Sequence, residues 1–150
     1  MSGTTTAMAT SFKSELLQAK HDFTASTGHA FKFALIKVTP TGTYGAASTN
    51  YSNITGNSDE VSGTGYTAGG FALTNVTPTT SGTTAYTTFS ANPSWTSATF
   101  SATAGMIYNT SQSNKACSTH DFGGTQTVSA GTFTVVLPTA DASNAILRFT

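Results

Sequence analysis

The chain has 150 residues, a third of them Ser or Thr, and its six basic and six acidic residues cancel to a formal net charge of zero. Nucleic acid binding requires clustered cations and an anionic membrane attracts basic segments, so this composition argues against both partners. One cysteine, Cys117, excludes an internal disulfide framework, and the lack of a run of about 18 apolar residues predicts no membrane span.

The first predicted elements are an arm and a helix. Residues 1–9 are predicted to be a flexible N-terminal arm or extension, and residues 10–150 a single β-sandwich domain with an N-terminal helix. In "TSFKSELLQAKHDF" the apolar residues fall near one face of a helix, which Thr10 or Ser11 can cap and which we expect to end between Lys20 and Phe23. The apolar face of this helix would contain Phe12, Leu16, Leu17 and Phe23.

The rest of the chain has the pattern of β-strands separated by turns. The apolar run 29–39 predicts a buried strand, and the polar stretch 40–59 predicts a long connection. The clearest alternation, over residues 99–108, predicts a strand that is buried on one face. Further strands are predicted within 70–77, 85–89, 117–124, 131–138 and 145–150. Because short links join most of them, we expect a mainly β domain, an antiparallel β-sandwich or jelly-roll-like fold with one short N-terminal helix.

The stretch "SDEVSGTGYTAGGFAL", residues 58–73, combines glycines with apolar side chains. Its glycine spacing differs from the GxGxxG pattern of a dinucleotide loop, and no lysine follows as a P-loop requires. We therefore interpret it as a bend between two strands, in which glycines adopt positive φ and permit close backbone approach. Tyr66 and Phe71 are then expected to pack against the sheet or against a neighbour. The glycines concerned are Gly63, Gly65, Gly69 and Gly70.

Few residues have the spacing of a catalytic or metal site. His120-Asp121 is the only adjacent pair of histidine and carboxylate, and two neighbours on a strand point to opposite faces. Asp59-Glu60 is interpreted as a solvated acidic loop, since calcium requires more oxygen ligands. Cys117 and His120 supply only two of the four ligands of a structural zinc. We therefore assign no catalytic, cofactor-binding or metal-binding residue, and we expect no cofactor and no enzymatic activity.

Trp95 is the only tryptophan of the chain. Burying it would contribute roughly 4–6 kcal/mol at most, from about 150–250 Å² of area at about 25 cal/mol per Å². We expect Trp95 to lie in the core, and a binding platform at the surface is the alternative.

Several segments taken together resemble a group of small tailed-phage virion proteins. In chain order they read "FALIKVT", "EVSGTGYTAGGFAL", "WTSATFSATAGMIYNT", "HDFGGTQTVSAGTFTVV" and "AILRF". The likeness covers most of the chain from Met8 on. The chain differs from the pattern of the group by its additional residues 1–7 and by the insertion "TPTGTYGAASTNYSN".

This resemblance implies a structural role and carries over no catalytic residue. The expected function is that of a head decoration or cement protein, which binds the major capsid protein at the outer capsid surface of the virion and stabilises the shell. A small homo-oligomer is expected, and a trimer would suit local threefold axes. The alternative is a tail, neck or fibre-associated protein that binds a host glycan. A glycan hydrolase, which needs two carboxylates about 5–9.5 Å apart, is disfavoured in a chain with six acids.

Overall fold

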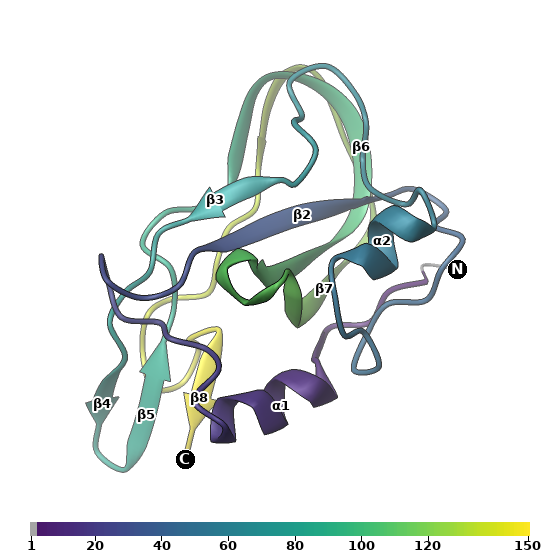
Figure 1. Ribbon diagram of the computed structural model, residues 1–150. Coiled ribbons are helices and arrows are strands. Elements are labelled where there is room, and N and C mark those ends of the chain that lie inside the picture. The colour runs from purple at the N-terminus through teal and green to yellow at the C-terminus, as the bar shows by residue number, and fades with distance from the viewer. Residues whose placement is uncertain (1–2) are drawn as a thin grey trace.

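The computed structural model describes residues 3–150, and its strands form two sheets (Figure 1). The helices are α1 (Thr10–Leu17) and α2 (Ser52–Gly56), with a 3-10 turn, η1 (Thr110–Gln112). The strands are β1 (Ala7–Met8), β2 (Phe31–Lys37), β3 (Phe71–Leu73), β4 (Thr79–Ser81), β5 (Thr84–Thr87), β6 (Ser94–Asn109), β7 (Lys115–Thr134) and β8 (Leu147–Phe149). All strand pairings in the two sheets are antiparallel. The predicted mainly β, antiparallel class with a short N-terminal helix is confirmed, and the arrangement is consistent with a β-sandwich.

The larger sheet has the strand order β1-β7-β6-β2-β3, and the smaller sheet has the order β4-β5-β8. In Figure 1, β6 and β7 bend together into an arch at the top of the view, while the smaller sheet lies at the lower left. The helix α1 lies beside β8, so elements from the two ends of the chain meet. This meeting point forms the groove described below.

The strand β6 is buried more completely than its alternation predicts. Thr99 is exposed, as expected of a half-buried strand, but residues 102–109 are all buried. On one face Tyr108 stacks on Tyr51, with ring centroids 4.4 Å apart, and on the other face Ile107 lies under α1 and the smaller sheet. The prediction of a single buried face is therefore wrong for the second half of β6. Small residues on its polar face permit a second layer to pack there.

The helix α1 is shorter than predicted. It ends at Leu17, because Ala19 has a left-handed backbone with φ of 55°, which a right-handed helix cannot contain. Ala9 occupies the cap position without a side-chain bond, so neither Thr10 nor Ser11 caps the helix. Leu17 is 91% exposed, so the expectation that it lies on the buried face is wrong.

The first described residues belong to the folded domain. β1 pairs with β7, and Thr4 forms a β-bridge with Tyr44. The prediction of a flexible arm over residues 1–9 is therefore wrong for residues 3–9, while Met1 and Ser2 lie outside the described residues. The physical reason is that the outer edge of β7 supplies partners for the backbone N–H and C=O groups of this uncharged segment.

The connection 40–59, predicted to be long and polar, is anchored at two points. It contains the short helix α2, and it buries the side chains of Tyr44 and Ile54 almost completely. These two apolar side chains attach an otherwise polar stretch to the core. The single short helix expected from the sequence is accompanied by this second, five-residue helix.

The glycine-rich segment forms the predicted bend against the sheet. Gly65, Gly69 and Gly70 have φ values of 82°, 95° and 77°. A Cβ atom on Gly70 would overlap the carbonyl oxygen of Phe33, so the close backbone approach also requires glycine. The side chains of Tyr66 and Phe71 both contact the ring of Trp95. Trp95 itself is 7% exposed, which confirms its predicted place in the core.

Candidate functional site

Glu60 holds the glycine-rich segment against the rest of the domain. Its Oε1 atom accepts hydrogen bonds from the Tyr66 hydroxyl (2.8 Å) and from the Gly69 backbone N–H (2.7 Å). Its Oε2 atom accepts a third from the Tyr51 hydroxyl (2.5 Å). The Tyr66 hydroxyl in turn accepts a bond from the backbone N–H of Leu35 (3.0 Å). One carboxylate therefore joins the bend, the start of α2 and the strand β2.

The tyrosines near Glu60 are fixed as protonated donors. Burial raises the pKa of Tyr51 and Tyr66, and the charge of Glu60 raises it further. Burial and Glu60 also raise the pKa of Tyr108 to about 12, and its hydroxyl donates to the Gly69 carbonyl (2.7 Å). General acid–base catalysis requires a pKa near the working pH. The cluster therefore has the properties of a structural clamp.

Asp59 forms a second, separate centre although it is next to Glu60 in the sequence. Its carboxylate is fully buried and accepts hydrogen bonds from the backbone N–H groups of Thr41 (3.0 Å) and Gly42 (2.7 Å). The Lys37 ammonium lies 3.1 Å from the Oδ1 atom. The interpretation of Asp59-Glu60 as a solvated acidic loop is wrong, because each carboxylate organises a loop from inside. The sequence shows the two acids but not the N–H groups that converge on them.

A third polar network lies at the end of α1. The Glu15 carboxylate pairs with Lys115 on β7 (2.5 Å) and with the Nε2 atom of His21 (2.9 Å). Burial lowers the pKa of His21 and outweighs the attraction of Glu15. The imidazole is therefore neutral at pH 7, with Nε2–H donating to Glu15. Its Nδ1 atom accepts from the side-chain amide of Asn109 (2.9 Å), which also contacts Nδ1 of His29 (3.0 Å).

This network orients a loop and engages both ring nitrogens of His21. The Nε2–H group donates to Glu15, and the Nδ1 lone pair accepts from Asn109, so His21 has no lone pair available for a proton from a substrate. Asn109 is fully buried at the end of β6, and its amide holds two histidines of the 18–30 loop in place. The network thus fixes the loop that forms one wall of the neighbouring groove.

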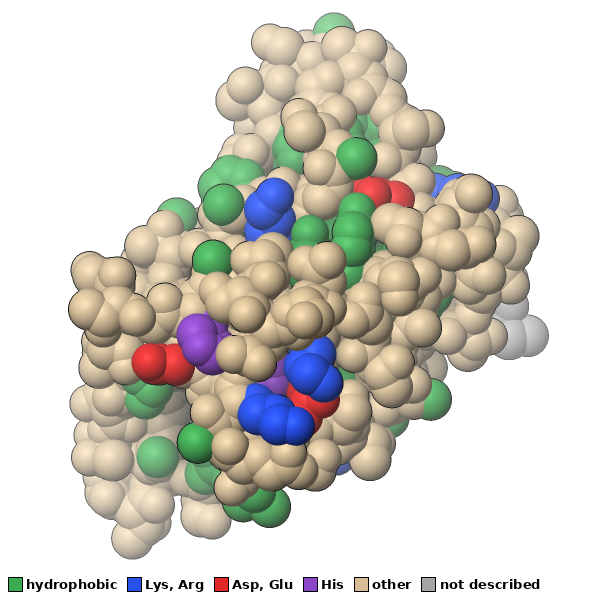
Figure 2. All heavy atoms as spheres, in the orientation of Figure 1, with side chains coloured by type: hydrophobic (Ala, Val, Ile, Leu, Met, Phe, Trp, Pro, Cys, Tyr) green, Lys and Arg blue, Asp and Glu red, His purple; other side chains and the backbone are tan. Residues whose placement is uncertain are grey.

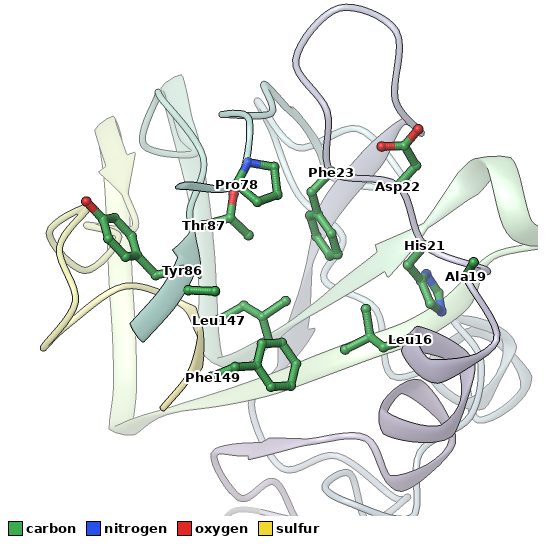
Figure 3. Close-up of a pocket in the computed structure, with 11 residues that line it drawn as sticks. Leu16, Ala19, His21, Asp22, Phe23, Pro78, Tyr86, Thr87, Leu147 and Phe149 are labelled. Carbon is green, nitrogen blue, oxygen red and sulfur yellow. The ribbon is translucent and has the colours of Figure 1, made fainter. Parts of the chain in front are cut away.

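The groove lies between α1, the loop that follows it and the smaller sheet. It has a volume of about 430 Å³. Figure 3 shows Leu16, Phe23, Leu147 and Phe149 directed toward the hollow, with His21 at the margin. Phe149 is 54% exposed, and Leu17, which follows Leu16 at the end of α1, is 91% exposed. An apolar recess beside exposed apolar side chains is a typical feature of a binding surface.

Charged side chains are sparse on the face drawn in Figure 2. They lie over the middle and lower parts of the view, and the upper lobe, which corresponds to the arch of β6 and β7, carries none on this face. Contacts made by the arch on this face would therefore depend on shape, backbone hydrogen bonds and apolar area.

His120 and its neighbours have separate partners. The His120 ring stacks on Phe33, with centroids 6.0 Å apart, and its Nε2 atom contacts the Ser118 hydroxyl (2.9 Å). The Asp121 carboxylate instead accepts from the backbone N–H of Gly123 (3.1 Å). The thiol of Cys117 is buried, which raises its pKa. No group of three or more His, Cys, Asp or Glu side chains suited to a metal ion occurs among residues 3–150.

We expect acid to weaken the fold through His120. Burial lowers the pKa of its ring to about 4 in the folded chain, whereas an unfolded imidazole has a pKa near 6.5. Between these values the unfolded state binds a proton that the folded state does not, so the free energy of unfolding falls as the pH falls. The slope from one such group approaches about 1.4 kcal/mol per pH unit. Denaturant melts between pH 7 and 4 measure it.

The control for this prediction is His120→Gln, which removes the titrating group. Its melts should show a shallower loss of stability over the same pH range, with the remaining slope due in part to His21, whose pKa is also lowered. An identical slope in wild type and variant would contradict a buried neutral His120.

Comparisons with known proteins identify no relative. A scan against protein-family models, a search of curated proteins and a search of solved structures each find no match. Within residues 3–150, no helix is both long enough and apolar enough to cross a membrane.

Proposed function

We propose that the chain is a non-enzymatic structural protein of a tailed-phage virion, which binds the outer surface of the capsid shell and stabilises it. The major capsid protein is the proposed partner, and a small homo-oligomer is the proposed binding unit. The observation that carries this proposal is the structure of segment 58–73, one of the stretches that resemble such virion proteins. Within this segment Glu60 accepts hydrogen bonds from the Tyr66 hydroxyl and from the Gly69 backbone N–H, which supports a structural role for the motif.

The surface supports attachment through apolar and backbone contacts. The groove beside α1 and β8 offers apolar area, and the chain has no net charge to direct binding. The N-terminal segment is already held within the domain, by Tyr44 at Thr4 and by β7 at Ala7 and Met8, so it is not free to bind a neighbour. Attachment should displace few counterions and should depend little on salt. A ligand that binds only the assembled shell stabilises it by about 2.7 kcal/mol per site at a hundredfold excess over its Kd.

The test is to count copies in purified particles and to rebind purified protein to shells that lack it. We expect a copy number comparable with that of the major capsid protein, binding that persists at high ionic strength, and a higher temperature of shell opening. A copy number of a few or a few dozen would contradict the head role and support the tail, neck or fibre alternative. Complete release by moderate salt would contradict attachment through apolar contacts.

Variants of the groove make the rebinding test specific. Leu17→Lys and Phe149→Lys place a charge beside the groove at exposed positions, so we expect weaker shell binding with little change in the unfolding midpoint. The matched control is Thr80→Lys, which adds the same charge at an exposed position on β4. Equal binding by all three variants would exclude the groove as the contact with the shell.

A further inference from the structure

The outer edge of β7 is occupied along only part of its length. β1 pairs with it at Ser118 and Thr119, and the last contact from the N-terminal segment is the Thr6 hydroxyl, which accepts from the backbone N–H of Asp121 (2.9 Å). Beyond Asp121, no other described strand pairs with this edge, although β7 continues to Thr134. An unpaired strand edge presents backbone donors and acceptors to any strand that can approach.

The central part of this free edge lacks the charged side chains and prolines that often block strand addition. Residues 122–134 include no charged residue and no proline. The backbone has positive φ at Gly123 and Gly124 and again at Ala130, and the five residues 125–129 lie between these points. Residues 126–128 of this window pair with β6 in regular register. Four of these five side chains are exposed. The pairing of β1 farther along the same edge shows that the edge accepts an antiparallel, uncharged segment of this chain.

The sequence of the window, "TQTVS", is compatible with pairing to itself about Thr127. In an antiparallel pair centred there, Thr127 faces Thr127 of the second copy, and Thr125 faces Ser129. Within one chain the Thr127 hydroxyl already bonds the Ser101 hydroxyl on β6 (2.8 Å), so the pairing would extend a row of hydroxyl groups across both copies. Opposed Thr and Ser pairs are favourable in sheets, and no like charges meet.

A hollow beside the same edge adds apolar area to the contact. It has a volume of about 460 Å³, and its apolar lining comes from Phe122, Val128, Phe133, Val135 and Val136. Val136 is 77% exposed. A backbone edge next to an apolar hollow is the combination used by proteins that bind an additional strand, since the edge supplies hydrogen bonds and the hollow receives side chains.

We propose that two copies of this chain associate through their free β7 edges, with residues 125–129 paired antiparallel about a twofold axis and the adjoining hollows closed between them. The interface is short, so the dimer belongs to the weak class that dissociates at micromolar concentration. The proposal specifies a pairwise unit where the sequence led us to expect a trimer. It does not depend on the virion role, and either can fail without the other.

The first test is sedimentation velocity of the full chain from low micromolar to about 200 µM. We expect the mass to rise from 15.4 kDa toward twice that value. Thr125→Lys with Thr127→Lys adds four like charges at the twofold interface and should leave a monomer at every concentration, with an unchanged unfolding midpoint because both side chains are exposed. The matched control, Ser52→Lys with Thr55→Lys on α2, adds the same charges at exposed positions and should dimerise like wild type.

The second test is site-specific cross-linking. Thr127→Cys places two thiols across the twofold axis, so mild oxidation should yield a disulfide-linked dimer, whereas Thr55→Cys should remain monomeric. The native thiol of Cys117 is buried and does not interfere. A wild-type chain that stays monomeric up to the highest concentration would overturn the proposal. So would an oligomer, trimer included, that persists in the lysine variant.

Discussion

Replacing Trp95 with alanine should lower the free energy of unfolding by about 3–5 kcal/mol, the range measured for truncation of large core aromatics. The indole is 7% exposed and is surrounded by four aromatic rings with centroids 5.8–6.3 Å away. These rings come from three parts of the chain: the glycine-rich bend with β3, the strand β6, and the strand β7. They belong to Tyr66, Phe71, Phe100 and Phe133. Loss of the indole would therefore open a cavity where the bend meets the arch.

Denaturant melts of Trp95→Ala and of Phe149→Ala measure this effect against a matched aromatic truncation. Phe149 is 54% exposed, so its loss should change stability by less than about 1 kcal/mol. A loss of half a kilocalorie or less in Trp95→Ala would show that the indole contributes little to the core. The binding-platform role for Trp95 would then regain support.

The cluster of aromatic side chains around Trp95 could be predicted from the sequence. Trp95 is the only tryptophan, and the glycines that precede Phe71 predicted a bend that brings aromatic side chains against the sheet. Both expectations are confirmed, because they depend on local properties: the size of an indole and the backbone freedom of glycine. The strand within 29–39 was also predictable from a local property, because its residues are mainly apolar.

The errors arose where long-range packing decides the outcome. Residues 3–9 contain no apolar pattern, and the short strand β1 within them forms only because the edge of β7 is there to pair with it. The second half of β6 is buried on both faces because α1 and Tyr51, which precedes α2, come from other parts of the chain to cover it. Leu17 fits a helical apolar face in the sequence, yet the turn at Ala19 redirects the chain before that face is complete.

The polar centres were the least predictable part of the molecule. The side chains of Glu15, Asp59 and Glu60 were visible in the sequence, but their partners lie up to 100 residues away, as Lys115 does from Glu15. Three of the six acidic residues therefore act as internal anchors for loops. A chain with so few charges can still use them in its interior, because each is matched by several donors.

Asp59 gives the second large expected effect. Replacing it with asparagine should lower the free energy of unfolding by about 3–5 kcal/mol, as loss of one partner from a buried charged network does. The carboxylate accepts bonds from Thr41, from the Gly42 N–H and from the Tyr44 hydroxyl (2.5 Å), and it pairs with Lys37. An amide has one acceptor oxygen where the carboxylate has two, so at least one of these donors would face an NH₂ group.

The pH dependence of the free energy of unfolding tests whether the contribution of Asp59 comes from its ionised carboxylate. Burial alone would raise the pKa of Asp59, but the hydrogen bonds from Tyr44, Gly42 and Thr41 outweigh it and hold the pKa well below the ordinary value near 4. A carboxyl with a depressed folded pKa stabilises the protein above its unfolded pKa, and this contribution is lost as the pH falls below about 4. Melts of wild type should therefore show a steep loss of stability in this range.

Asp59→Asn should be less stable at neutral pH and should lose less stability on acidification, because it lacks the titrating group. The matched control is Asp22→Asn, which changes an exposed carboxyl on a loop. The pKa of Asp22 is lowered chiefly by hydrogen bonds from Thr24, a smaller set of donors than surrounds Asp59, so this variant should stay much closer to wild type than Asp59→Asn at both pH values. If Asp59→Asn loses as much stability on acidification as wild type does, the carboxyl group responsible for that loss is not Asp59. If its stability at pH 7 equals that of wild type, the donors around the carboxylate find other partners, and the loop 40–59 is held by Tyr44 and Ile54 alone.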